Sequence, residues 1–206
     1  MKNIFVTAAA AGLLAIVTAA ALPAQQIASS DTSTVQAGAY KVDGYHSQVV
    51  FSVSHFGFTD FSGLFSEATG TLQLDPAHPA ASRLEISFPI QSVTTTVAKL
   101  DDELKGDKWF DAAKFPNATF VSTSVTPTGK GRATVTGNLT LHGVTKPVTL
   151  TANFVGAGVN PLSKAYTLGF HATGTIKRSD FGVSTYVPLI GDDVQLSLAG
   201  SFEKQG

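Results

Sequence analysis

From residue 40 onward, hydrophobic and polar residues alternate along the chain with a period of two. In one such run Phe51 and Val53 alternate with Ser52 and Ser54. Successive side chains of a β-strand point to opposite faces, so this pattern predicts strands with one buried face. The runs lie at residues 47–56, 61–74, 83–91, 117–126, 132–141, 146–155, 165–177 and 193–203.

Short turn signals rich in glycine, proline, aspartate and asparagine separate these runs, at residues 75–76, 127–131, 142–143, 156–161 and 191–193. Consecutive strands joined by short turns favour an antiparallel up-and-down arrangement. Eight such strands can close into a barrel whose interior holds side chains or one small ligand. The pattern therefore predicts an all-β fold, an eight-stranded antiparallel β-barrel.

One segment between the third and fourth predicted strands breaks the alternation. Val97, Leu100 and Leu104 recur at helical spacing, with charged residues on the other face, and Trp109 and Phe110 follow. This predicts one short helical insertion. It is either a lid over the lumen or a helix that only closes one end of the barrel, and the pattern does not decide between them.

The N-terminal segment has the features of an export signal. Lys2 precedes an apolar, alanine-rich run at 4–22 that ends in small residues, which predicts a cleaved signal peptide at 1–24 with cleavage near Ala24. The competing interpretation is a membrane anchor, because the run is nearly long enough to span a bilayer. Residues 25–39 are polar and lack periodicity, so we expect a flexible tether before a single domain at 40–206. The expected location is periplasmic or secreted.

Composition excludes several classes of function. The formal net charge is −1 and 14% of residues are charged, so no basic surface for nucleic acid is expected. There is no cysteine, and the five histidines are widely spaced, so we expect no metal site and no cofactor. No Gly-x-Ser-x-Gly motif is present, and the acidic run 101–103 fits a solvated helix face. We therefore expect no catalytic residues and no enzyme.

The inward parity of the strands gives a set of candidate lumen residues. The apolar residues of the insertion are added to this set. The full set is Phe51, Val53, His55, Leu72, Ile86, Phe88, Leu100, Leu104, Trp109, Phe110, Phe120, Leu139, Leu150, Phe154, Leu168, Phe170 and Leu196. An alkyl chain buried against such a lining gains about 0.8 kcal/mol per methylene. Periodicity alone leaves open whether the lumen is hollow or packed.

Four residues are candidates for the rim of the barrel: Asp43, His142, Arg178 and Asp180. Arg178 and Asp180 share one face of an extended stretch, so they could pair with each other or with Asp43. We expect this pairing to join the last hairpin to the first strand, and the alternative is an anchor for a ligand head group. His142 lies at a hairpin end, where its side chain can bond the turn backbone. His55 is either a hydrogen-bonded core histidine or a contact for a head group.

Several motifs occur together in one order along residues 40–203. They are VDGYHS at 42–47, FSVSHFG at 51–57, GLF at 63–65, GTL at 70–72, WFD at 109–111 with FP at 115–116, LTLHGVTKPV at 139–148 and RSDFGV at 178–183. In this set the chain resembles the YceI-like polyisoprenoid-binding family. The resemblance implies a lipocalin-like barrel, a periplasmic location, and a long isoprenoid, a polyprenyl chain or an isoprenoid quinone, held in the lumen for transport, storage or stress protection.

The insertion departs from the family pattern. Where the family usually has Asn, Arg and His, this chain has Val97, Leu100 and Glu103, although Asp101 and Leu104 are kept. These changes bear on whether the helix contacts a polar head group of the ligand, and on which ligand is chosen.

Two further functions remain open at this stage. One is a barrel enzyme of the isomerase or cyclase type acting on a lipid. The other is a packed, ligand-free interaction module, for which outward Val50, Phe56, Phe58 and Phe61 could form a surface for a homodimer.

Overall fold

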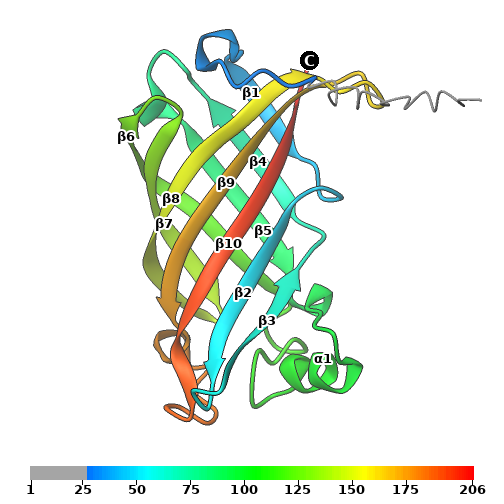
Figure 1. Cartoon of the computed structure of the whole chain (residues 1–206), viewed down its shortest axis with the longest axis vertical. Coiled ribbons are helices and arrows are strands. Elements are labelled where there is room, and N and C mark those ends of the chain that lie inside the picture. The colour runs from blue at the N-terminus through cyan, green and yellow to red at the C-terminus, as the bar shows by residue number, and fades with distance from the viewer. Residues whose placement is uncertain (1–26) are drawn as a thin grey trace, which may run out of the picture.

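A computed structural model describes residues 27–206 as a closed antiparallel β-barrel with one α-helix at one end (Figure 1). The strands are β1 Gly38–Val42, β2 Gln48–His55, β3 Thr59–Phe65, β4 Thr69–Leu74, β5 Arg83–Pro89, β6 Asn117–Gly129, β7 Arg132–Leu141, β8 Val144–Val159, β9 Tyr166–Lys177 and β10 Ile190–Lys204. The helices are η1 Thr32–Thr34, η2 Pro79–Ala81, η3 Ile90–Ser92, α1 Ala98–Lys105 and η4 Arg178–Phe181.

The barrel has eight strands because the first two are each interrupted once. Both β1 and β2 pair with β10, with Val42 opposite Phe202 and Val49 opposite Leu198. In the same way β3 pairs with β2 and β4 with β1. β1–β2 and β3–β4 therefore each act as one broken barrel strand, followed by β5 to β10 in order. The predicted eight-stranded antiparallel barrel is confirmed.

The strand boundaries differ from the prediction in several places. β1 was not predicted, and the predicted strand 61–74 is broken at 66–68. Residues 156–159 and 191–193, predicted as turns, continue β8 and β10 instead. Irregular pairing lies next to both: the register shifts between Phe154 and Gly156 and between Ile190 and Val194. A bulge lets a strand run through a glycine-rich or acidic stretch that looks like a turn in sequence.

Residues 27–37, which we call the N-terminal strap, are bound to the barrel rather than forming the predicted tether. The Ser29 amide donates to the Ala157 carbonyl at 2.8 Å, and the Ala157 amide donates back to Ser29 at 2.9 Å. The Tyr166 hydroxyl donates to the Thr34 carbonyl at 3.0 Å. Contacts made mainly through backbone atoms leave no periodic pattern of side chains, so the sequence pattern could not predict them.

The predicted signal peptide, its cleavage site near Ala24 and residues 25–26 lie outside the described residues. Between residues 27 and 206, no helix is both long and apolar enough to cross a membrane.

The helical insertion lies between the third and fourth barrel strands, as predicted, and covers the edge of β3 (Figure 1). Leu64 of β3 and Thr94 exchange two backbone hydrogen bonds, each of 2.9 Å. The Asp101 carboxylate accepts from the Thr95 amide at 2.6 Å and from the Thr95 hydroxyl at 2.7 Å, so it ties the first turns of α1 to the segment before it. These bonds hold the apolar face of α1 against the barrel.

Candidate functional site

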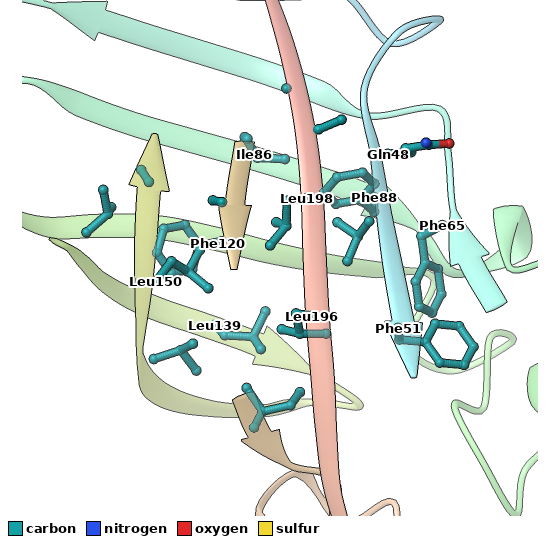
Figure 2. A pocket seen from close by; sticks show the side chains of 18 of the residues that line it. Gln48, Phe51, Phe65, Ile86, Phe88, Phe120, Leu139, Leu150, Leu196 and Leu198 are labelled. Atoms are coloured by element: carbon teal, nitrogen blue, oxygen red, sulfur yellow. The ribbon is translucent and has the colours of Figure 1, made fainter. Parts of the chain in front are cut away.

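The interior of the barrel contains a cavity of about 720 Å³ that extends from η1 at one end to α1 at the other. Figure 2 shows side chains from different strands, among them Phe51, Phe120 and Leu150, that surround this space. Its wall is almost entirely apolar. The volume lies within the roughly 300–1,000 Å³ that is typical of small-molecule sites. The lumen is therefore hollow, which answers the question that periodicity left open.

The structure places nearly all of the predicted lumen residues in the cavity wall: Phe51, Val53, His55, Leu72, Ile86, Phe88, Leu100, Leu104, Trp109, Phe110, Phe120, Leu139, Leu150, Phe154, Phe170 and Leu196. Leu168 is the exception. It is nearly fully buried in a packed cluster with Tyr40 and Phe202 and does not reach the cavity.

Cross-strand pairing brings these side chains together. Phe120 of β6 lies opposite Leu139 of β7, and Phe51 of β2 lies opposite Leu196 of β10. Directly opposed residues share a face of the sheet, so each pair contributes two apolar groups to the wall.

Further wall residues follow the same parity and could have been found from it, including Val135 and Leu198. Phe65 also lines the cavity, but it has the opposite parity to Leu72 in the predicted strand 61–74, and the break at 66–68 is what turns it inward. Thr32 and Val35 of the N-terminal strap also reach the cavity, and no sequence signal pointed to them.

The charged side chains of the wall lie at its two ends. At the α1 end Glu103, Trp109, Arg178 and Tyr186 line the cavity. The Trp109 indole N–H donates to a Glu103 carboxylate oxygen at 3.2 Å. The centre of its ring system lies 5.5 Å from the Arg178 guanidinium carbon and 6.4 Å from the Tyr186 ring. The α1 end therefore combines a carboxylate, a guanidinium and two aromatic rings around one opening.

Arg178 does not form the predicted ion pair with Asp180 or Asp43. Its Nε donates to the Gly191 carbonyl at 2.9 Å, and its two terminal nitrogens donate to the carbonyls of Val183 and Ile190, each at 2.8 Å. Only 5% of the residue is exposed, and burial lowers the pKa of its guanidinium. Backbone carbonyls carry no sequence signal, which explains the wrong prediction.

Neither carboxylate bonds to Arg178. Asp43 belongs to the break between β1 and β2, where it contacts His46 Nδ1 at 2.6 Å and accepts from the Ser201 hydroxyl at 3.4 Å. Asp180 lies in η4, and Asp192, not Asp180, binds the η4 backbone by accepting from the Ser179 amide. Asp43 is thus separated from Arg178 by most of the length of β10.

The two histidines of the candidate site differ in role. His142 Nδ1 lies 3.1 Å from the Phe181 carbonyl and its ring packs against Phe115, so it joins the β7–β8 turn to η4 and not to its own turn. His55 lines the cavity but is exposed, with its ring edge-to-face with Phe56. His55 therefore lies where the cavity meets solvent and is not a core histidine.

The outward aromatic surface is smaller than expected. Phe58 is 87% exposed at the β2–β3 turn, but Phe56 and Phe61 also line the cavity and Val50 is half-buried. Among residues 27–206, no three His, Asp or Glu side chains are grouped as a metal site would require.

A sequence model described as the YceI-like domain matches residues 40–202. The chain belongs to this family. A UPF0312 protein of Pseudomonas savastanoi pv. phaseolicola is 40% identical over 163 residues, covering 79% of this chain and 84% of the relative. A UPF0312 protein of Yersinia pestis is 39% identical over 162 residues, covering 78% and 83%.

Solved structures share the YceI-like barrel. Burkholderia cenocepacia BcnA aligns with a TM-score of 0.70 at 28% identity, covering 78% of this chain and 98% of that one. A Campylobacter jejuni YCEI protein aligns with a TM-score of 0.65 at 30% identity, covering 74% and 90%. A polyisoprenoid binding domain from Saccharophagus degradans aligns with a TM-score of 0.60 at 16% identity, covering 82% and 100%, a likeness of fold.

Proposed function

We propose that the protein binds one long-chain isoprenoid, a polyprenyl chain or an isoprenoid quinone, along the barrel axis. The observation that carries the proposal is the continuous apolar cavity of about 720 Å³ between η1 and α1. β10 has 15 residues, so at about 3.3 Å per residue and a tilt of about 40° the barrel is roughly 35–40 Å tall. A long, apolar cavity suits a linear hydrocarbon tail.

Membership of the YceI-like family supports this ligand class. The Saccharophagus degradans neighbour is named as a polyisoprenoid binding domain, and the same barrel architecture encloses the cavity here. We propose the same class of ligand for this chain because its cavity wall offers apolar contacts along the lumen.

We propose binding rather than catalysis. The two charged groups of the α1 end are engaged with the protein itself, Glu103 with Trp109 and Arg178 with three backbone carbonyls. His55 also lines the cavity but lies exposed beside Phe56, and none of the ion pairs among residues 27–206 pairs it with a carboxylate. An isomerase or cyclase needs an acid or base free to reach the substrate at one point. We further propose a periplasmic or secreted location, supported by the apolar N-terminal run, and a role in transport, storage or stress protection of the lipid.

Native mass spectrometry of protein purified from its source tests the proposal directly. We expect one bound lipid per chain, released by organic extraction and identified as an isoprenoid. Protein that is reproducibly free of lipid, and that takes up no isoprenoid when mixed with one, would contradict it.

A matched pair of variants tests where the lipid lies. Ala172 lines the cavity, whereas the next residue on β9, Thr173, is exposed on the outer face. We expect Ala172→Phe to block the lumen and abolish lipid retention, and Thr173→Phe to retain it. Because the lumen is hollow, Ala172→Phe should avoid most of the roughly 1–3 kcal/mol cost of overpacking a solid core. Equal retention by the two variants would place the lipid outside the barrel.

A further inference from the structure

Four exposed apolar side chains lie on two loops at the α1 end of the barrel. The loops are the β2–β3 turn at 56–58 and the segment between η4 and β10 at 182–189, and we call them the tip loops (Figure 1). Phe56, Phe58, Tyr186 and Leu189 are between 47% and 87% exposed. The Phe56 amide donates to the Leu189 carbonyl at 3.0 Å, which joins the two loops. Exposed large apolar side chains gathered in this way mark an interaction surface.

This surface is continuous with the cavity. Phe56 and Tyr186 line the cavity as well as being exposed, whereas Phe58 and Leu189 are exposed without lining it. The tip loops therefore extend the apolar wall of the lumen to the outside of the barrel.

The tip loops are uncharged, and their backbone is largely hydrogen-bonded within the protein. Neither loop contains Asp, Glu, Lys or Arg, although 14% of the whole chain is charged. The amides of Phe58, Val187 and Ile190 donate to carbonyls within or next to the loops, and Pro188 has no amide hydrogen to satisfy. A segment that enters a bilayer avoids charged side chains and unpaired backbone groups, because both are costly in hydrocarbon. The composition and hydrogen bonding of the tip loops suit such an environment.

Two of the four residues are held outward by an uncommon backbone conformation. Phe56 has a φ of 54° and Tyr186 a φ of 60°, in the left-handed region that bulky side chains rarely adopt. Neither side chain is buried in the protein in return. An unfavourable conformation that exposes an aromatic ring points to a contact outside the folded chain.

The surface fits a lipid bilayer better than a protein partner. A standard protein interface takes about 20–30 residues from each side, whereas the tip loops present four large apolar side chains on two short segments. Aromatic rings are favourable at the boundary between membrane and water, and they anchor peripheral proteins there together with leucine. Because the tip loops carry no basic residue, their contact does not depend on anionic lipid.

We propose that the tip loops dock the protein reversibly on a bilayer of phospholipids with neutral head groups. Phe58 and Leu189 enter the bilayer, and Phe56 and Tyr186 lie at its surface. Docking needs no ligand in the cavity and so goes beyond the proposed function. It places the α1 end against the membrane, where an apolar ligand passes between bilayer and lumen without crossing water.

Co-sedimentation with phosphatidylcholine vesicles that contain no isoprenoid tests docking by itself. We expect wild-type protein to bind them, with little change between about 0.05 and 0.5 M NaCl, because no ion pair is involved. The double variant Phe58→Ser, Leu189→Ser should bind at least about tenfold more weakly, since two apolar side chains no longer leave water. Leu162→Ser is the matched control. Leu162 is 89% exposed in the β8–β9 turn at the opposite end of the barrel, and this variant should bind like wild-type protein.

A fluorescent label locates the contact, because the chain has no cysteine of its own. An environment-sensitive nitrobenzoxadiazole group attached at Phe58→Cys should brighten and shift to the blue when the vesicles are added, since it leaves water. The same group attached at Leu162→Cys should not respond. An equal response from both positions would mean adsorption over the whole molecule and would overturn the proposal.

Three further outcomes would also overturn it. The first is equal sedimentation of wild-type protein and the double variant, or sedimentation of neither. The second is binding only to vesicles that contain phosphatidylglycerol, with release by salt, since charged residues outside the tip loops would then make the contact. The third is a wild-type dimer in light scattering that becomes a monomer in the double variant, without vesicle binding, because the surface would then belong to a second copy.

The proposed function is tested separately from docking. Phe58 and Leu189 do not line the cavity, so the double variant should retain as much lipid in native mass spectrometry as wild-type protein does. Failure of docking with lipid retained would strike only this inference, whereas docking by a protein that retains and takes up no lipid would strike only the proposed function.

Discussion

Tyr40 connects the barrel core to the N-terminal strap. The residue is fully buried, and its hydroxyl donates to the Gln36 carbonyl at 2.6 Å. Burial, and secondarily the proximity of Tyr166, raises the pKa of Tyr40 to about 12. The ionised form is therefore disfavoured in the folded protein relative to the unfolded chain, where tyrosine titrates near 10.

Tyr40→Phe should change how stability depends on alkaline pH. With the folded pKa raised, the stabilisation is complete below about pH 10 and is lost as the pH rises toward 12, because only the unfolded chain releases the proton. We expect urea midpoints of wild-type protein to fall over this window by the equivalent of roughly 2–3 kcal/mol. Tyr40→Phe should lose about 1 kcal/mol at pH 7 and show a weaker alkaline decline. Parallel curves for the two proteins would count against this assignment.

A pair of glycines tests how tightly the barrel wall is packed. A Cβ on Gly137 would lie 2.4 Å from the Phe120 ring and 2.6 Å from the Val121 carbonyl oxygen, whereas a Cβ on Gly129 would meet nothing closer than 3.8 Å. We expect Gly137→Ala to lower the free energy of unfolding by about 1–3 kcal/mol. Gly129→Ala should change it by less than about 0.5 kcal/mol. Denaturant unfolding of both variants checks this, and equal effects would contradict it.

Individual wall residues could be predicted from sequence because parity is a local property. Phe51 and Phe120 were assigned inward from their neighbours alone, and both line the cavity. Leu168 has the same parity, but whether it reaches the lumen depends on its packing with Phe202, opposite it on β10, and with Tyr40 of β1. The partners of Arg178 are backbone carbonyls, which every residue has, so no pattern could point to them.

The insertion that carries α1 depends on few hydrogen bonds. The Asp101 carboxylate binds the Thr95 amide and hydroxyl, and the hydrogen bonds from Thr95 hold the pKa of Asp101 below its usual value of 3.8. A lowered carboxyl pKa means that this stabilisation is complete above about pH 4 and is lost as the pH falls further. The acidic run was predicted to be only a solvated helix face. One of its residues, Asp101, also fixes the start of α1 by binding the segment before it.

Asp101→Asn should remove this acid sensitivity. In wild-type protein we expect hydrogen-exchange protection of the Thr95 amide, relative to its intrinsic rate, to fall as the pH drops below about 4. In Asp101→Asn protection should be lower at neutral pH and should not change in this range. Core amides of β9 provide the internal control. Protection at Thr95 that follows pH identically in the two proteins would contradict the role given to Asp101.

Element positions were predicted better than element ends. The insertion was located correctly because its helical period contrasts with the alternation on both sides. β1 was missed because it presents only Tyr40 and Val42 as buried positions, too few to establish a period. The N-terminal strap is bound mainly through backbone atoms and polar side chains, so its order follows from the finished barrel and not from its own composition.

The hollow interior makes stability of the whole molecule depend on its occupant. A ligand that binds only the folded state adds RT ln(1 + [L]/Kd), about 2.7 kcal/mol at a hundredfold excess over Kd. For a barrel of this size that corresponds to a rise in Tm of roughly 5–10 °C. We expect protein stripped of lipid by organic extraction and refolded to melt lower by this amount and to recover when isoprenoid is returned. The Ala172→Phe variant should show no such recovery, and a response in that variant would argue for binding elsewhere.

The N-terminal strap and the end of β10 share one end of the barrel, opposite α1 (Figure 1). Lys204 Nζ donates to the Gln36 side-chain oxygen at 2.8 Å, and the Gln205 amide donates to the Ala39 carbonyl at 2.9 Å. A protein immobilised on a sensor chip through a tag after Gly206 would therefore present the α1 end of the barrel to the flowing sample. Vesicles or a delivery partner passed over such a chip would meet the α1 opening first, whereas coupling through Lys99 or Lys105 on the helix would turn that opening toward the chip.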